Sequence, residues 1–295
     1  MSLRLSLFQS VFLTVARLRD GKVGDPVKDR ESGEKLEKRL RLAKGVAEQW
    51  TTVADVRCLR LRKEHGPASR GVLLHLHGGG YTAGTALSAR IMSKLVALTG
   101  VEMVSVDYRR PPEHPYPAAV DDALAVFRAL TQQHGAEAIV VLGESAGGGL
   151  LLSLLQRVRA EGLPMPAAAV PYFPWCDLTQ SAPSYTATPA RDILRKATLD
   201  LSAKLYAGDL DLRDPGLSPI NATFDGFPKT LVPVGTRDHF LAECRRLVEL
   251  MNAAGVAVDL LEVPNAIHGF VIVPAPEVRA VQQRVAGFIT QALRA

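Results

Sequence analysis

The stretch that decides the fold is VVLGESAGGGLLLSLL, residues 140–155, where a β-branched apolar run meets glycines and then leucines. Residues 147–149 are all glycine, although a helix should begin there and each glycine inside a helix costs about 1 kcal/mol relative to alanine. We infer that close packing and substrate access determine the residue types here, rather than helix propensity. A plain glycine-rich turn between a strand and a helix is the structural alternative.

The segment Gly143-Glu144-Ser145-Ala146-Gly147 has the GxSxG pattern at a predicted strand-to-helix junction. In such a junction a strained serine sits on a very tight turn, and its neighbours must be small so that strand and helix can approach. Gly143 and Gly147 meet that demand. The backbone N–H of Ala146, at the positive end of the following helix, is placed to stabilise a developing oxyanion.

A second glycine cluster is LHLHGGGY, residues 74–81, in which a predicted strand runs directly into three glycines. Their uncovered backbone N–H groups are typical of an oxyanion hole. A phosphate-binding loop is the competing interpretation, but the P-loop lysine and the GxGxxG spacing are both missing.

A serine nucleophile needs a base, and in enzymes with this serine turn the acid and then the histidine follow the serine along the chain. Of the seven histidines only His239 and His268 satisfy that order, and His268, in a loop shortly after the last predicted strand, is the better candidate. Asp238 follows the strand TLVPVG and is the predicted acid, with Glu243 as the fallback. A helix N-cap is the structural alternative for Asp238.

From about residue 55 short β-rich runs alternate with segments of helical length, which predicts an α/β fold with a mostly parallel sheet. Two blocks break the alternation, residues 1–50, with a charged helix expected through residue 50, and residues 177–213. We expect them to form a cap over a core made of residues 51–176 and 214–295. Apolar cap residues expected partly to line the path to the serine are Leu5, Phe8, Phe12, Leu201, Leu205 and Tyr206. The predicted strands are residues 56–62, 71–77, 102–108, 138–143, 167–173, 230–235 and 258–263.

Composition narrows the class of protein further. The 35 Lys and Arg residues are scattered among 30 Asp and Glu, so no nucleic-acid surface is indicated. The cysteines, Cys58, Cys176 and Cys244, are far apart, which argues against a disulfide framework or a metal motif and favours a cytoplasmic location. No uninterrupted apolar run reaches 18 residues, so stable membrane insertion is not expected.

The chain resembles the hormone-sensitive-lipase-like esterases of the α/β-hydrolase fold from about residue 55 onward. The matching segments are HLHGGGY, VDYRRPPEHPYPAAVDDA, GESAGGGL, DPGLSP, VGTRDHF and IHGF, in the family's order. The resemblance implies a catalytic triad of Ser145, Asp238 and His268, and a cap built from the N-terminus and the segment before DPGLSP. It implies that His77 orders the glycine loop rather than moving protons. The implied oxyanion donors are Gly78, Gly79 and Ala146, and the implied supporting residues are His77, Gly80, Gly143, Glu144 and Gly147.

The chain departs from the family pattern at several positions. Glu144 stands where many members carry Asp, and Arg110-Pro111 replaces Leu-Ala before PEHP. His239 and Phe240 replace the Pro-Leu that usually follows the acid. These departures leave the predicted triad residues in place.

The leading prediction is a serine carboxylester hydrolase that acts on small to medium acyl esters through an acyl-enzyme. Its expected partner is a small-molecule ester, no metal or organic cofactor is expected, and a homodimer is left open. One alternative is a non-catalytic small-molecule-binding protein on the same scaffold, which the presence of His268 disfavours. Another is an acyltransferase or amidase with the same triad.

Overall fold

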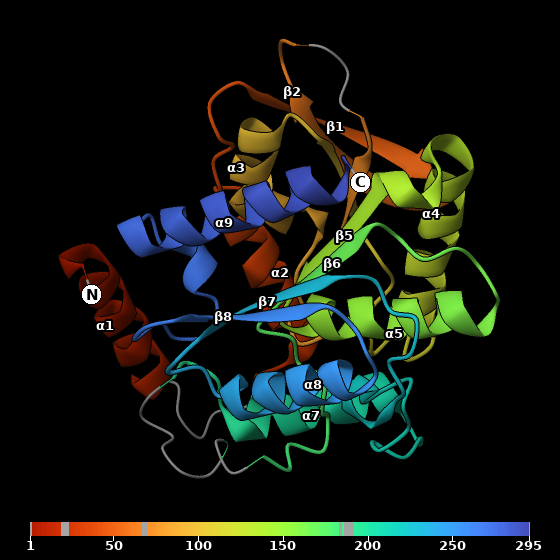
Figure 1. Ribbon diagram of the computed structural model, residues 1–295. Helices are drawn as coiled ribbons and strands as arrows, with labels where there is room; N and C mark the ends of the chain where they lie inside the picture. The colour runs from red at the N-terminus through yellow and green to blue at the C-terminus, as the bar shows by residue number, and fades with distance from the viewer. Residues whose placement is uncertain (1, 19–23, 67–69, 183–184, 186–191, 295) are drawn as a thin grey trace.

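The computed structural model describes residues 2–18, 24–66, 70–182, 185 and 192–294. Eight strands form one sheet in the order β1-β2-β4-β3-β5-β6-β7-β8 (Figure 1). β2 runs antiparallel to both of its neighbours, and all other pairs are parallel. The strands are β1 Val46–Val53, β2 Val56–Lys63, β3 Val72–Leu76, β4 Glu102–Val106, β5 Ile139–Glu144, β6 Ala168–Tyr172, β7 Thr230–Gly235 and β8 Val258–Val263.

Helices cover both faces of this sheet, and the predicted α/β fold with a mostly parallel sheet is confirmed. α3 and α9 pack together on one face, and α4, α5 and α8 lie on the other (Figure 1). The described helices are α1 Leu3–Leu18, α2 Pro26–Glu37, α3 Ala89–Thr99, α4 Ala118–His134, α5 Ala146–Ala160, α7 Lys196–Ala207, α8 Leu241–Ala253 and α9 Pro276–Ala292. No helix in the described part of the chain is long and apolar enough to cross a bilayer.

All seven predicted strands are present, but the helix expected through residue 50 is wrong. α2 ends at Glu37, and residues 46–53 form β1, which pairs with β2 along its whole length. Gly45, at a positive φ of 76°, closes the turn before β1, and the run WTTV at residues 50–53 is rich in β-favouring side chains. Pairing with β2 therefore overrides the helical character of the charged residues before it.

The central strands β3 and β5 are buried on both faces, which explains why their sequences are apolar almost throughout. Because β3, β5, β7 and β8 are parallel, their carboxyl ends reach one edge of the sheet. The loops that carry the glycine cluster, Ser145, Asp238 and His268 follow these four strands in turn. The topology thus gathers residues far apart in sequence at one edge.

The glycines of the opening stretch are explained by close contact with other parts of the backbone. A Cβ atom on Gly147 would lie 2.0 Å from the carbonyl oxygen of Leu76, and one on Gly149 would lie 2.1 Å from that of Trp175. On Gly148 it would lie 2.9 Å from the Cα of Pro174. These positions admit no side chain, so the start of α5 sits directly against β3 and the loop after β6.

Three helices from the predicted cap blocks are described, namely α1, α2 and α7. α1 lies beside the start of α9, where the hydroxyl of Ser2 donates a 2.7 Å hydrogen bond to Glu277 (Figure 1). Residues 1, 19–23, 183–184 and 186–191 of the cap blocks lie outside the described part. The division into core and cap stays a prediction.

Candidate active site

Ser145 occupies the turn between β5 and α5 with φ +54° and ψ −120°, a conformation that L residues rarely adopt. Its backbone N–H donates to the carbonyl oxygen of Tyr172 at 3.0 Å. Its own carbonyl oxygen accepts from the N–H groups of Gly149 and Trp175 at 3.1 and 2.9 Å. These bonds hold the strained serine in place, as in the tight turn that the sequence predicts.

The structure brings the three predicted triad side chains together. The Oγ of Ser145 lies 2.9 Å from Nε2 of His268, and Nδ1 of His268 lies 2.9 Å from Oδ2 of Asp238. Because a carboxylate can only accept, Nδ1–H donates to Asp238, which leaves Nε2 to accept the serine proton. Oδ1 of Asp238 also accepts from the N–H of Phe240 at 2.9 Å, so this aspartate fixes the loop before α8 as well.

Two aromatic rings enclose the imidazole of His268. The rings of Phe173 and Phe240 contact it edge to face, with centroid distances of 4.8 and 4.9 Å. Burial lowers the pKa of His268, but the charge and hydrogen bond of Asp238 and the charge of Asp192 raise it. The net effect is a pKa above the usual value of 6.5, because the carboxylates stabilise the imidazolium.

Asp192, from the second cap block, is a buried residue that the sequence analysis missed. Its Oδ1 accepts from the N–H of His268 at 2.9 Å and from that of Ile193 at 2.7 Å, and its Oδ2 accepts from the N–H of His239 at 2.8 Å. It thus ties the loop of the acid to the loop of the base. Burial and the charge of Asp238 raise the pKa of Asp192. No local motif marks it, because its partners are backbone groups 47 and 76 residues away.

The other sequence candidates have different partners in the described part of the chain. Glu243, the fallback acid, is buried, accepts from the N–H of Cys176 at 2.8 Å and contacts the hydroxyl of Tyr185. Burial raises the pKa of Glu243 to about 8. The backbone N–H of His239 donates to Asp192, and the His239 ring packs near Tyr185. The structure therefore places Asp238 and His268, and neither Glu243 nor His239, in the chain of hydrogen bonds to Ser145.

The glycine loop lies directly opposite the serine turn. A Cβ atom on Gly78 would lie 3.4 Å from the Cβ of Ser145, and the loop of Gly78, Gly79 and Gly80 lines the same cavity as the serine. Ala146 is the first residue of α5, so its N–H is among those that a helix leaves without an internal partner. The glycine loop and the first residue of α5 therefore both lie next to Ser145.

His77 and Glu144 directly precede Gly78 and Ser145 in the chain. Nδ1 of His77 lies 2.8 Å from the carbonyl oxygen of Gly78, and the ring of His77 stacks on Tyr108 at 4.0 Å. Burial and the nearby charge of Arg110 hold the pKa of His77 well below its usual value, so the ring stays neutral. Glu144 is buried and lies 2.9 Å from Nε2 of His75, whose other nitrogen lies 2.7 Å from Ser105.

A cavity of about 490 Å³ opens next to Ser145 and His268. Its volume is within the range for small-molecule sites, and its lining is largely apolar. Leu201 of the second cap block lines it as expected, whereas Tyr206 is buried and stacks on Tyr81 at 3.8 Å. From the N-terminal block it is α2, through Pro26, Asp29, Gly33 and Glu37, that lines the cavity in the described part, and α1 does not.

In the described part of the chain, one group of side chains has the spacing to hold a metal ion, namely Asp192, Asp238 and His268. Their ligand atoms lie within 4.8 Å of one another. All four carboxylate oxygens, however, already accept hydrogen bonds from N–H groups of the protein. Those bonds fit an acid–base role for this group better than a metal site.

Known proteins share this fold. A family model described as the α/β-hydrolase fold matches residues 73–272. An acetyl-hydrolase of Streptomyces hygroscopicus is 40% identical over 199 residues, which are 66% of this chain and 67% of that protein. The carboxylesterase NlhH of Mycobacterium tuberculosis is 32% identical over 220 residues, 69% of each chain. The crystal structure of a hormone-sensitive lipase from a metagenome library superimposes with a TM-score of 0.94, at 32% identity over 99% of both chains.

The chain belongs to the α/β-hydrolase family, among the esterases that resemble hormone-sensitive lipase. It is a carboxylesterase of the serine hydrolase type.

The two carboxylates beside His268 generate a prediction about pH dependence. The base must be neutral to accept a proton, so log kcat/KM should rise with pH through one ionisation above 6.5, where the raised pKa of His268 places it. Asp192→Asn removes one of the raising charges and should move this ionisation to lower pH. The control Asp200→Asn, at a half-exposed carboxylate paired with Lys196, should leave it in place. An unchanged or higher ionisation in Asp192→Asn would contradict the electrostatic account.

Proposed function

We propose that Ser145 is the nucleophile, His268 the base and Asp238 the residue that orients the base. The observation that carries this proposal is the unbroken chain of two 2.9 Å contacts from Ser145 through His268 to Asp238. Together with the strained serine turn, this chain is the arrangement that activates a serine hydroxyl for attack on a carbonyl carbon.

In the proposed mechanism Ser145 Oγ attacks the ester carbonyl carbon while Nε2 of His268 takes the hydroxyl proton. The N–H groups of Gly78, Gly79 and Ala146 stabilise the negative oxygen of the tetrahedral intermediate. His268 then gives its proton to the departing alcohol, and an acyl-enzyme remains. In the second half of the reaction, Nε2 of His268 takes a proton from a water molecule, which attacks the acyl carbon. The carboxylic acid then leaves, and His268 returns the proton to Ser145 Oγ.

We propose substrates with short to medium acyl chains. The largely apolar cavity of about 490 Å³ supports this size, and so does similarity to an acetyl-hydrolase. Transfer of the acyl group to an acceptor other than water, or amide hydrolysis, would use the same residues. Turnover assays with alcohol acceptors and with amide substrates distinguish those activities from ester hydrolysis. A receptor without catalysis is disfavoured by the complete triad.

A cytoplasmic location and a homodimer remain proposals. The location is supported by the three cysteines, all of which are buried and unpaired. Light scattering on the purified protein tests the homodimer.

Ser145→Ala should fold with an unchanged melting temperature and lose p-nitrophenyl acetate hydrolysis by a factor on the order of 10³ to 10⁶, because the covalent route disappears. The control Ser10→Ala, at an exposed serine of α1, should retain full activity. Substantial turnover by a folded Ser145→Ala would exclude the proposed nucleophile.

The substrate class is tested by narrowing the cavity. Leu201→Trp places a larger side chain in the cavity wall, so kcat/KM for p-nitrophenyl octanoate should fall several-fold more than for the acetate. The control is Leu98→Trp at an exposed position of α3, which should change neither. An equal loss on both esters in Leu201→Trp would show that this part of the cavity does not hold the acyl chain.

A further inference from the structure

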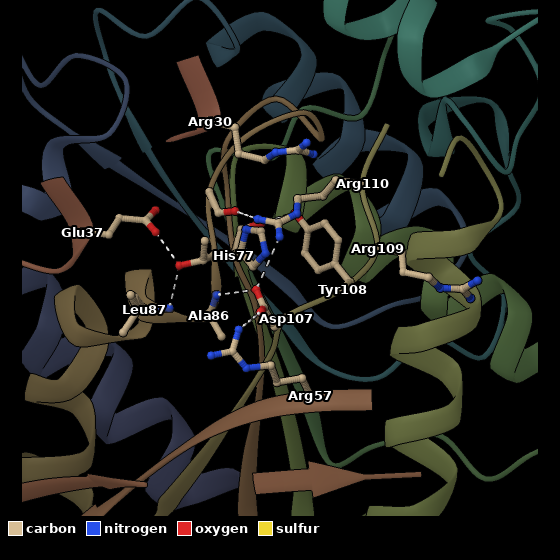
Figure 2. Close-up of polar contacts among 12 residues, drawn as sticks. Arg30, Glu37, Arg57, His77, Ala86, Leu87, Asp107, Tyr108, Arg109 and Arg110 are labelled. Carbon is tan, nitrogen blue, oxygen red and sulfur yellow. Dashed lines mark hydrogen bonds and ion pairs between the residues drawn. The ribbon is translucent and has the colours of Figure 1, made fainter. Parts of the chain in front are cut away.

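Residues 84–86, which lie shortly after the glycine loop, are each held by a charged side chain from α2 or from the segment after β4 (Figure 2). The partners are Arg110 for the carbonyl oxygen of Gly84, Glu37 of α2 for the hydroxyl of Thr85 at 2.5 Å, and Asp107 for the N–H of Ala86 at 3.3 Å. Three consecutive residues are thereby tied to charges.

Gly84 is in direct contact with the oxyanion glycines. A Cβ atom on Gly84 would lie 2.2 Å from the carbonyl oxygen of Gly78 and 2.8 Å from Nδ1 of His77. The loop also folds back on itself, since the N–H of Ala83 donates to the carbonyl oxygen of Gly79 at 2.9 Å. A shift of Gly84 therefore moves the peptide groups of Gly78 and Gly79.

Arg110 is the central member of this cluster. Its guanidinium donates through Nη1 to Gly84, and its Nη2 lies 3.7 Å from Oδ1 of Asp107. The Arg110 side chain is only 14% exposed and that of Asp107 8%, so solvent screens their attraction far less than that of a surface pair. The side chain of the neighbouring Arg109 points away from that of Arg110 (Figure 2). It pairs with Asp122 on α4.

We propose that Arg110 is a positioning residue of the oxyanion hole, which fixes the donors of Gly78 and Gly79 by bridging the carbonyl oxygen of Gly84 to the carboxylate of Asp107. The inference rests on the proposed function, because it assumes that these glycines stabilise the oxyanion. Arg110 acts through Gly84 and makes no contact with the triad in its described hydrogen bonds and ion pairs.

The test is Arg110→Leu, which keeps an apolar stem of similar length and removes both polar contacts. We expect kcat for p-nitrophenyl acetate to fall about tenfold with KM within about twofold, since loss of an entire oxyanion donor costs about 10² to 10³. A trifluoromethyl ketone, whose carbonyl carbon bonds to Ser145 Oγ and whose oxygen becomes an oxyanion, should bind weaker by the same factor. The ionisation of His268 in the pH profile should not move, because the triad is untouched.

Arg109→Leu is the matched control and should leave kcat and ketone inhibition unchanged. If Arg110→Leu does not fold, Arg110→Lys and Asp107→Asn carry the test, each with a smaller loss in the same direction. Wild-type ketone inhibition in the folded variants, or an equal loss in Arg109→Leu, would overturn the proposal. Failure of the proposed function itself would look different, because the ketone would then not inhibit the wild-type protein and Ser145→Ala would stay active.

Discussion

The rest of the site depends on one constraint, the positive φ of Ser145 in the turn between β5 and α5. That conformation lifts the hydroxyl out of the sheet edge, but it persists only because surrounding groups hold it. The backbones of β3 and of the loop after β6 approach so closely that residues 147–149 cannot carry a side chain. The start of α5 therefore consists of glycines in spite of their low helix propensity. The close approach that they allow brings the glycine loop against Ser145.

The electrostatics around His268 follow from burial. Two phenylalanine rings remove the imidazole from water, which by itself would disfavour the imidazolium formed during catalysis. Asp238 and Asp192 compensate with two nearby negative charges. The second of these lies outside the predicted core, in the block of residues 177–213 that the sequence predicts as part of a cap, and its charge also raises the pKa of the base.

The sequence predicted the α/β fold, the seven strands and the meeting of Ser145, Asp238 and His268, because each depends on local patterns and on chain order. It did not predict β1, since the strand character of residues 46–53 emerges only on pairing with β2. It did not find Asp192, whose role depends on backbone groups of distant loops. The sequence also predicted that α1 lines the cavity, whereas the described lining residues of the N-terminal helices come from α2. The reason is that amphipathicity shows which face of a helix is apolar but not what that face covers.

The central claim is that Ser145 attacks while the glycine loop and Ala146 hold the oxyanion. It is tested most directly by the crystal structure of the protein after reaction with diethyl p-nitrophenyl phosphate, in which p-nitrophenolate leaves as Ser145 bonds to phosphorus. The account predicts phosphorus on Ser145 Oγ, with the phosphoryl oxygen about 2.7 to 3.2 Å from the backbone nitrogens of Gly79 and Ala146. Phosphorus on another residue, or a phosphoryl oxygen turned away from both N–H groups, would contradict it.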